Sequence, residues 1–408
     1  MTDHLYYHDS FLYEFDADVV DLATVDSRPV LVLDRTAFYP TSGGQVFDTG
    51  WIASPGSNQK SRIAEVSEKD DGTILHFLDK APELKAGSRV HGVIDIDRRR
   101  DHMQQHSGQH VLSAAFIQLF NMPTVSFHMG DESCSIDLDT KNLSSAQVEQ
   151  GEALANEVVT QDRSVTIRFV TQEEAKGLGL RKIPPVGREK LRLIDIHDFD
   201  LTACGGTHVA RTGQIGSILL RKTEKVRQGW RVEFVCGQRA VNTARHDYAT
   251  LFESAGLLSS HVWDVAQQIR KVQDENRASR KAGEQLLEEL TGFYAIQLLG
   301  ETTEHQGRRI ISRIFADRDS VFIKLLAQKL TRTSPNAIAL LASTSGQPTL
   351  VFAQSAGQPF DMGALMKETL ASLGGRGGGS KDMAQGGPAE TGQLQAALDQ
   401  VATKLQQA

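Results

Sequence analysis

The sequence predicts an α+β protein built from several domains. Its 408 residues exceed what a single domain of about 150 residues would use. Residues 1–95 read as short apolar strands separated by Gly, Pro and Asp, whereas later segments mix helical and strand periodicities. We therefore expect a small β-barrel domain at 1–95, an α+β domain at 96–237, a helical connector at 238–293 and a small α/β domain at 294–408.

The expected barrel, for which a sandwich is the alternative, has strands at PVLVLDRT, RIAEV, HFLD and RVHGVIDI. The segment AFYPTSGGQVFDTGW lies between two of these strands. Pro40, Gly43 and Gly44 in it fix a special backbone path. Taken alone, this segment is better explained as a hairpin turn.

The second region begins with DRRRDHMQQHSGQHVLSAAFIQLF, whose apolar residues predict an amphipathic helix. The expected stripe contains Val111, Leu112, Ala115, Phe116 and Leu119. TVSFHMGDESCSIDLD alternates like a strand hairpin, and the segment 144–160 predicts a helix opened by a serine cap. SVTIRFV, LRLIDI, IGSILL and RVEFV are expected strands, whereas QEEAKGLGLRKIPPVGREK is expected to be a loop-bearing connection.

Beyond residue 237 the chain is first helical and then alternates strand and helix. Charges of both signs interleave over 238–293, which is typical of a solvated helix. RIISRIF, AIALLAS and TLVFAQ predict strands, and DSVFIKLLAQKL and MGALMKETLASL predict helices. GGRGGGSKDMAQGGPAETGQ reads either as a flexible linker or, with Arg376 and Lys381, as a backbone-amide phosphate site followed by a last helix.

Two pairs of residues predict a zinc site. His106 and His110 lie at i and i+4, so a helix presents both imidazoles on one face. Cys204 and His208 flank a turn that two glycines make permissive. Together they form a normal nitrogen and sulfur set for one Zn2+ per chain. The alternative is a histidine pair satisfied by its neighbours.

The residues around these pairs are given supporting roles. Asp200 is a candidate acceptor for the second nitrogen of a ligand imidazole. His102, His128 and His197 are expected to be structural or to support the ligands, and Cys134 and Cys236 to be core residues.

Charge and cysteine content limit the setting. Three cysteines cannot build a disulfide framework, no run is long enough to span a membrane, and the acidic and aromatic N-terminal segment does not resemble a signal peptide. We expect a cytoplasmic protein with no membrane partner. The net charge of −7 argues against sequence-blind nucleic-acid binding but leaves room for a local basic face.

Two basic runs could form such a face, or could simply be solvated. They comprise Arg98, Arg99 and Arg100 in the first and Arg221, Lys222, Lys225, Arg227 and Arg231 in the second.

FYPTSGGQ, HSGQH, SFHMGDESCSIDLD and DFDLTACGGTHVARTGQIG, in this order, resemble the editing domain of alanyl-tRNA synthetases and the free-standing alanyl-tRNA editing proteins of the AlaX type. GGRGGGSKDMAQGG resembles the Gly-rich signature of their C-terminal domain, which is also found in DHH-type phosphoesterases (DHHA1-like). The chain carries no Asp-His-His triplet, so phosphoesterase activity is not expected. Carrying both modules, the chain is similar to the long AlaX form.

This resemblance implies a zinc-dependent deacylase that acts in trans on the acceptor end of tRNA(Ala) mischarged with serine and, as a second substrate, glycine. A pocket for alanine cannot strongly reject serine, so a second site must read the hydroxyl. We assign that reading to Thr41 and Gln45, close approach of the ribose to Gly43 and Gly44, and the metal to His106, His110, Cys204 and His208.

Several points stay open at this stage. Cys204 and its partners either activate water through the metal or only shape the pocket. Arg376 and Lys381 are further candidate substrate contacts, and the C-terminal domain either grips the tRNA or forms a homodimer. The rival functions are a non-catalytic, zinc-stabilised tRNA-binding protein and a small-molecule esterase.

Overall fold

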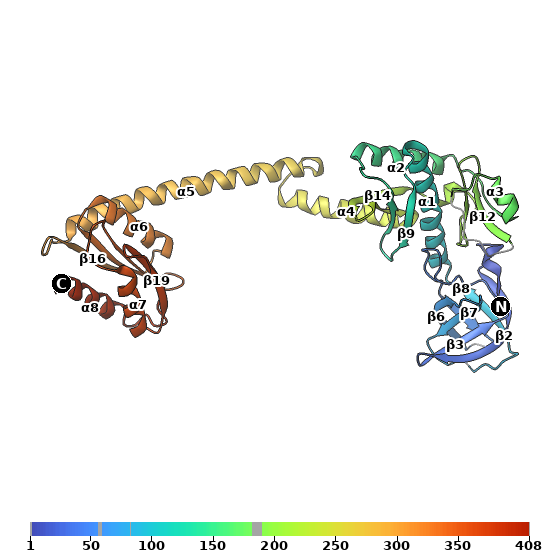
Figure 1. The fold of residues 1–408 in the computed structure, drawn as a ribbon, viewed down its shortest axis with the longest axis horizontal. Helices are drawn as coiled ribbons and strands as arrows, with labels where there is room; N and C mark the ends of the chain where they lie inside the picture. Colours follow the sequence, from blue (N-terminus) through green and yellow to red (C-terminus); the bar gives the residue numbers. More distant parts are fainter. Residues whose placement is uncertain (1, 56–58, 82, 182–189, 408) are drawn as a thin grey trace. The chain divides into compact units, whose positions relative to one another are not determined.

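The computed structural model describes residues 2–55, 59–81, 83–181 and 190–407. It divides into two compact units, Met1–Glu253 and Ser254–Ala408 (Figure 1). Both units mix helices with sheets, as the α+β prediction requires. The finer division into four domains stays a prediction. No helix among the described residues is long and apolar enough to cross a membrane.

The first unit begins with a closed barrel of six strands in the order β2-β3-β7-β6-β5-β8. They are β2 (Glu14–Val25), β3 (Arg28–Leu33), β5 (Gly50–Ala53), β6 (Lys60–Glu68), β7 (Ile74–Leu78) and β8 (Arg89–Ile94). In β2, Phe15, Ala17 and Val19 are buried while their neighbours are exposed, which is the period of two that a barrel wall requires. Strands β1 (Asp3–His4) and β4 (Arg35–Thr36) pair in parallel and form a separate sheet of two strands. The predicted barrel is confirmed.

Helix α1 (Ile96–Phe120) follows, capped by the Asp95 side chain and ended by Asn121 in the left-handed region. It is buried almost all round from His102 to Phe116, polar residues included. The predicted apolar stripe is right except at its end, because Leu119 is 42% exposed. So many buried polar groups on one helix are costly unless each has a partner, which indicates a site built on α1.

Two antiparallel sheets complete this unit. One has the order β14-β15-β10-β9 and the other β11-β12-β13. Their strands are β9 (Thr124–Met129), β10 (Cys134–Leu138), β11 (Val165–Thr171), β12 (Lys190–Ile196), β13 (Asp200–Ala203), β14 (Ile218–Val226) and β15 (Gly229–Cys236). The helices are α2 (Ser145–Thr160), α3 (Gln172–Lys176) and most of α4 (Gly237–Leu257), whose last residues belong to the second unit. Ser144 opens α2 with a capping box, as predicted.

Three expectations in this region change. β13 was not foreseen, because only four residues form it before the glycine turn. The expected strand at IGSILL begins only at Ile218, since the residues before it form a 3-10 turn. The expected loop-bearing connection begins with a helix, α3, at Gln172–Lys176, and residues 182–189 of it lie outside the described residues.

The second unit contains α5 (Val265–Glu301) and carries a five-stranded sheet ordered β16-β17-β18-β20-β19. Its other elements are β16 (Arg309–Phe315), α6 (Ser320–Thr333), β17 (Ala337–Ser343), β18 (Thr349–Gln354), α7 (Met362–Ser372), β19 (Arg376–Gly379), β20 (Met383–Gly387) and α8 (Leu394–Gln407). Alternate residues of β17 pack on α5 and α6 from one face and on α7 and α8 from the other. The sheet is therefore covered on both faces.

The Gly-rich stretch is neither a linker nor a loop. Most of it forms the β19–β20 hairpin at one edge of this sheet. A Cβ at Gly386 would lie 2.2 Å from Leu370 Cδ1 and 2.8 Å from Gly377 Cα, so glycine lets both α7 and the paired strand approach closely.

Candidate metal centre

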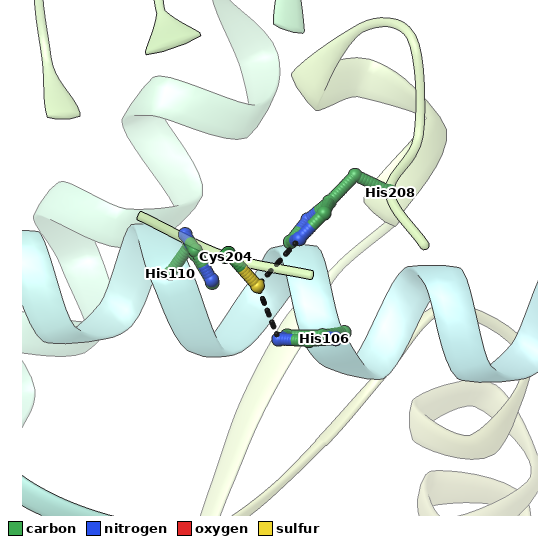
Figure 2. Close-up of side chains that lie close together, drawn as sticks. All are labelled: His106, His110, Cys204 and His208. Carbon is green, nitrogen blue, oxygen red and sulfur yellow. Dashed lines mark hydrogen bonds between the residues drawn. The ribbon is translucent and has the colours of Figure 1, made fainter. Parts of the chain in front are cut away.

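Helix α1 and the segment after β13 bring the four predicted ligands together (Figure 2). One ligand atom from each of His106, His110, Cys204 and His208 lies within 4.8 Å of every other. The helix supplies two imidazoles one turn apart, and the glycine turn brings Cys204 and His208 back to that face. The juxtaposition predicted from the sequence is confirmed.

The spacing of the donor atoms suits zinc. Cys204 Sγ lies 3.4 Å from His106 Nε2 and 3.4 Å from His208 Nε2. Zinc–sulfur and zinc–nitrogen bonds of about 2.3 and 2.05 Å at tetrahedral angles would separate these atoms by about 3.5 Å. The cluster could therefore hold a metal ion without large movement, and its mixture of imidazole and thiolate favours zinc.

Each imidazole also has a partner behind it. His106 Nδ1 lies 2.7 Å from the Gln45 amide oxygen, and His208 Nδ1 lies 3.1 Å from Ser107 Oγ. Asp200 Oδ2 is 3.6 Å from His110 Nδ1, which is an ionic contact slightly too long for a hydrogen bond. The Gln45 amide oxygen and the Asp200 carboxylate can only accept, so they favour the proton on Nδ1 of His106 and His110 and leave Nε2 of these rings free for a metal. Asp200 therefore contacts His110 through its charge, whereas the hydrogen bond foreseen between them is not formed, since His110 Nδ1 has no hydrogen-bond partner among the described residues.

Electrostatics favour the ligand form of Cys204 and His208. Burial opposes ionisation of Cys204, but the imidazoles of His106 and His208 outweigh it and hold the thiol pKa well below its ordinary value. Burial, helped by His106, also holds the pKa of His208 well below its ordinary value. A thiolate and a neutral imidazole are the forms that bind a metal.

The ligand His110 contacts the Asp200 carboxylate, and the two groups shift each other's pKa. Burial lowers the pKa of His110, but Asp200 and Cys204 more than offset it, so the net shift is upward. Burial raises the pKa of the Asp200 carboxyl, whereas His110 and Arg181 lower it to a net value below normal. Arg181 binds both oxygens of Asp200, at 2.8 and 3.0 Å.

A cavity of ≈ 390 Å³ opens beside the cluster. Three of the four ligands line it, together with residues of β9, of the turn after β13 and of the loop that precedes β5. These are Tyr39, Ser42, Gly43, Gln109, Thr124, Val125, Ser126, Phe127, Arg181, Thr202, Ala203, Gly205 and Gly206, with His106, His110 and Cys204. The cavity is large enough for the esterified end of a nucleoside and is polar on several sides.

The loop residues predicted to contact the substrate lie in different environments. Gly43 lines the cavity, and both Gly43 and Gly44 have positive φ, so the special path foreseen there is real. Thr41 is exposed, and its amide donates to Val66 O. Gln45 is completely buried and holds Thr207 Oγ1 at 2.8 Å as well as His106. A direct substrate contact by Gln45 would require it to give up one of these bonds.

The cations considered as contacts for tRNA differ in their burial and in whether they form ion pairs. Arg99 is wrong as a phosphate ligand, because it is completely buried against Asp48 at 3.1 Å and donates to Ser10 O and Ala37 O. Arg221, Lys222 and Arg231 are paired with Asp247, Glu224 and Asp137. Arg376 and Lys381, in the second unit, are exposed and make no ion pair within the described part of the chain.

Several supporting residues were not found from the sequence. Ser107, Thr207 and Arg181 have no motif of their own. Ser107 and Thr207 could have been suspected because they lie inside the ligand motifs HSGQH and CGGTH. No sequence feature around Arg181 indicates its role, because only the fold brings this residue to Asp200.

Comparison with known proteins defines the class first. Residues 8–98 match the family described as tRNA synthetases class II (A), residues 191–233 the threonyl and alanyl tRNA synthetase second additional domain, and residues 307–407 the DHHA1 domain. The metal cluster lies partly within the second match. Fold, site and family matches thus define a protein related to the alanyl-tRNA synthetases.

The particular family follows from full-length relatives. The chain is 31% identical to the alanyl-tRNA editing protein AlaX-L of Pyrococcus horikoshii, over 95% of this chain and 94% of that protein. It is 30% identical to the alanine–tRNA ligase of Pyrococcus abyssi and 31% identical to that of Thermococcus kodakarensis, but covers only 44% and 41% of their lengths. The chain belongs to the AlaX-type alanyl-tRNA editing family, as its motifs indicated.

Proposed function

We propose that this protein hydrolyses the ester of tRNA(Ala) mischarged with serine and, as a second substrate, glycine, acting in the cytoplasm on tRNA released by the synthetase. The observation that carries the proposal is the four-ligand cluster opening on a cavity bordered by the SGGQ loop. A relative of this chain, similar over nearly its whole length, is named as an alanyl-tRNA editing protein. The alternative, a tRNA-binding protein without turnover, shares all of these features.

The chain's own residues organise the reaction. Zn2+ held by His106, His110, Cys204 and His208 would supply either polarisation of a water or ester oxygen, or a fixed pocket wall. Four side-chain ligands fill a tetrahedral shell, so we favour the second role. Tyr39, Ser42 and Gly43 would position the aminoacyl end against this wall, and backbone groups would hold the attacking water.

Selection of serine over alanine requires a polar group that loses its partner when the hydroxyl is absent. Thr41 stays our candidate because it belongs to the loop that supplies Ser42 and Gly43 to the cavity. Gln45 contributes from behind His106, by holding the imidazole and the CGGTH turn. Thr41→Val should therefore reduce hydrolysis of the seryl ester, while Thr41→Ser, which keeps the hydroxyl, should retain it.

The deciding experiment follows ester loss from seryl-, glycyl- and alanyl-tRNA(Ala) with the full chain before and after chelation. We expect the seryl ester to be lost fastest, the alanyl ester to be spared, and activity to return with added zinc. Binding of tRNA without ester loss would favour the non-catalytic alternative. Equal hydrolysis of small serine esters and seryl-tRNA would favour the esterase.

For the second unit we propose tRNA contact by Arg376 and Lys381 and self-association through α5. The exposed apolar residues Leu286, Phe293 and Ile296 on that helix support self-association, since they are between 65% and 71% exposed. Sedimentation of the full chain and of Leu286→Lys/Phe293→Lys would test it. A monomeric wild-type chain would reject the homodimer.

A further inference from the structure

A second hollow lies next to the metal cavity and has no role so far. It measures ≈ 800 Å³ and is formed by the tip of the β14–β15 hairpin, the segment that follows β10, and Val125 of β9. We call it the hairpin groove; its lining is Val125, Asp139, Thr140, Lys141, Asn142, Lys225, Val226, Arg227, Gln228 and Gly229.

The hairpin groove is bordered by free cations. Lys141, Lys225 and Arg227 are all exposed and make no ion pair within the described ranges of the chain. Other cations on the same two strands are neutralised, with Lys222 at 2.6 Å from Glu224 and Arg231 at 2.7 Å from Asp137. Asp139 is the one carboxylate among the residues of the lining. Positive charge is therefore left unpaired where the surface is hollowed.

Hydrogen bonds and close backbone packing hold the walls of the groove in place. Trp230 Nε1 donates to Lys141 O at 3.3 Å, and the Asp139 amide donates to Pro123 O at 2.9 Å. A Cβ at Gly229 would lie 2.0 Å from Leu138 O, so only glycine lets the hairpin tip approach β10 this closely. The cations are thus carried on backbone that is fixed on both sides.

The groove adjoins the metal cavity. Val125 lines both hollows, and it is 55% exposed on β9, the edge strand of its sheet. Residues follow each other along a strand at about 3.3 Å, so the two hollows are separated by roughly the width of one residue. A chain molecule whose end lies in the metal cavity would leave it past Val125 and cross the free cations.

We propose that the hairpin groove binds backbone phosphates of the tRNA acceptor strand next to its 3′ end, while the esterified end occupies the metal cavity. This inference rests on the proposed function and names the surface by which that site recognises tRNA. Phosphates fit because Lys and Arg at a fixed spacing neutralise them without regard to base sequence. Each such contact releases counterions from the tRNA, so the affinity for tRNA that the groove contributes should fall as the salt concentration rises.

The test is charge reversal in the full chain, Lys225→Glu/Arg227→Glu. Its matched control is Arg168→Glu/Lys176→Glu, two exposed cations elsewhere in the same unit that are already paired with Asp195 and Glu173. Hydrolysis is followed on seryl-tRNA(Ala) and on seryl adenosine, which lacks acceptor-stem phosphates. Binding of uncharged tRNA is measured over a range of salt concentrations.

We expect the groove variant to raise KM for seryl-tRNA about tenfold or more and to leave hydrolysis of seryl adenosine unchanged. The slope of log affinity for uncharged tRNA against log salt should become shallower by about 2, for two lost contacts. Wild-type affinity and slope in the variant would overturn the proposal. Equal loss on both substrates would also overturn it, because the groove would then serve the chemistry or the fold.

The experiments distinguish a failure of the proposed function from a failure of the proposal for the hairpin groove. If the wild-type chain hydrolyses neither ester, the proposed function is wrong, and the binding measurement still decides on the groove. Lys225→Gln/Arg227→Gln removes the charges without introducing new ones. It should show about the same change of slope, so a misfolded charge-reversal variant does not leave the groove undecided.

Discussion

At the scale of single residues, the CGGTH turn leaves no room for a side chain at Gly206 where it packs against α1. A Cβ at Gly206 would fall 2.1 Å from His106 Cε1 and 2.9 Å from the Gln45 amide oxygen. At Gly205 the nearest atom would be Tyr7 Oη at 3.5 Å, an ordinary contact. The two neighbouring glycines therefore differ sharply in what they tolerate.

We expect Gly206→Ala to displace His106 and lower zinc affinity roughly tenfold to a hundredfold, with a comparable loss of deacylation. Gly205→Ala should keep its metal. Zinc content after dialysis against a graded chelator series measures both variants. Full zinc retention by Gly206→Ala would show that the imidazole can move aside without cost.

At the scale of elements, β7 buries a histidine in the barrel wall. His76 is completely buried; its Nδ1 lies 3.0 Å from Leu31 O and its Nε2 2.9 Å from Thr36 Oγ1. Burial lowers the pKa of His76 to about 4, against a weaker opposing effect of the Leu31 carbonyl. The unfolded chain therefore takes up a proton at higher pH than the folded chain.

The consequence for stability has a definite sign. The contribution of neutral His76 is complete above the ordinary pKa of about 6.5 and is lost as pH falls from there to about 4, amounting to roughly 3 kcal/mol. Urea unfolding of wild type and His76→Gln between pH 7.5 and 4.5 measures it. The variant should lose less stability over this interval. The exposed His197→Gln should follow wild type, and parallel curves for His76→Gln would contradict the assignment.

The Gly-rich hairpin of the second unit gives another prediction at this scale. Gly386 is pressed against Leu370 of α7, whereas a Cβ at Gly378 would meet only Lys367 Cε at 3.6 Å. Gly386→Ala should destabilise the second unit by about 1–3 kcal/mol through overpacking. Gly378→Ala should change stability little. Thermal unfolding of both variants measures the difference, and equal melting would mean that α7 shifts freely.

At the scale of the whole molecule, the division between Glu253 and Ser254 leaves the barrel, the metal cluster and the hairpin groove in one unit. A fragment ending at Ser260 should bind zinc and hydrolyse seryl adenosine at the wild-type rate. Its KM for seryl-tRNA should rise several-fold if the second unit holds part of the tRNA. Equal KM values for fragment and full chain would confine tRNA recognition to the first unit.

The sequence by itself determined the ligand set and most elements. The i, i+4 spacing of His106 and His110 is read directly from the helix period, and the Cys204–His208 turn carries its own glycines. Alternation predicted the barrel because one face of each strand must be apolar. Composition misled at the Gly-rich stretch, where glycine serves close packing of α7 rather than flexibility.

Only the tertiary structure decided which polar groups meet. Gln45 hydrogen-bonds to His106, Arg99 is paired with Asp48, and Lys225 and Arg227 line the hairpin groove without an ion pair among the described residues. These partners come from segments distant in sequence, and a side chain's role depends on whether a counter-charge and solvent reach it after packing. Local periodicity carries no information about that, because it specifies which face of an element is buried but not what it is buried against.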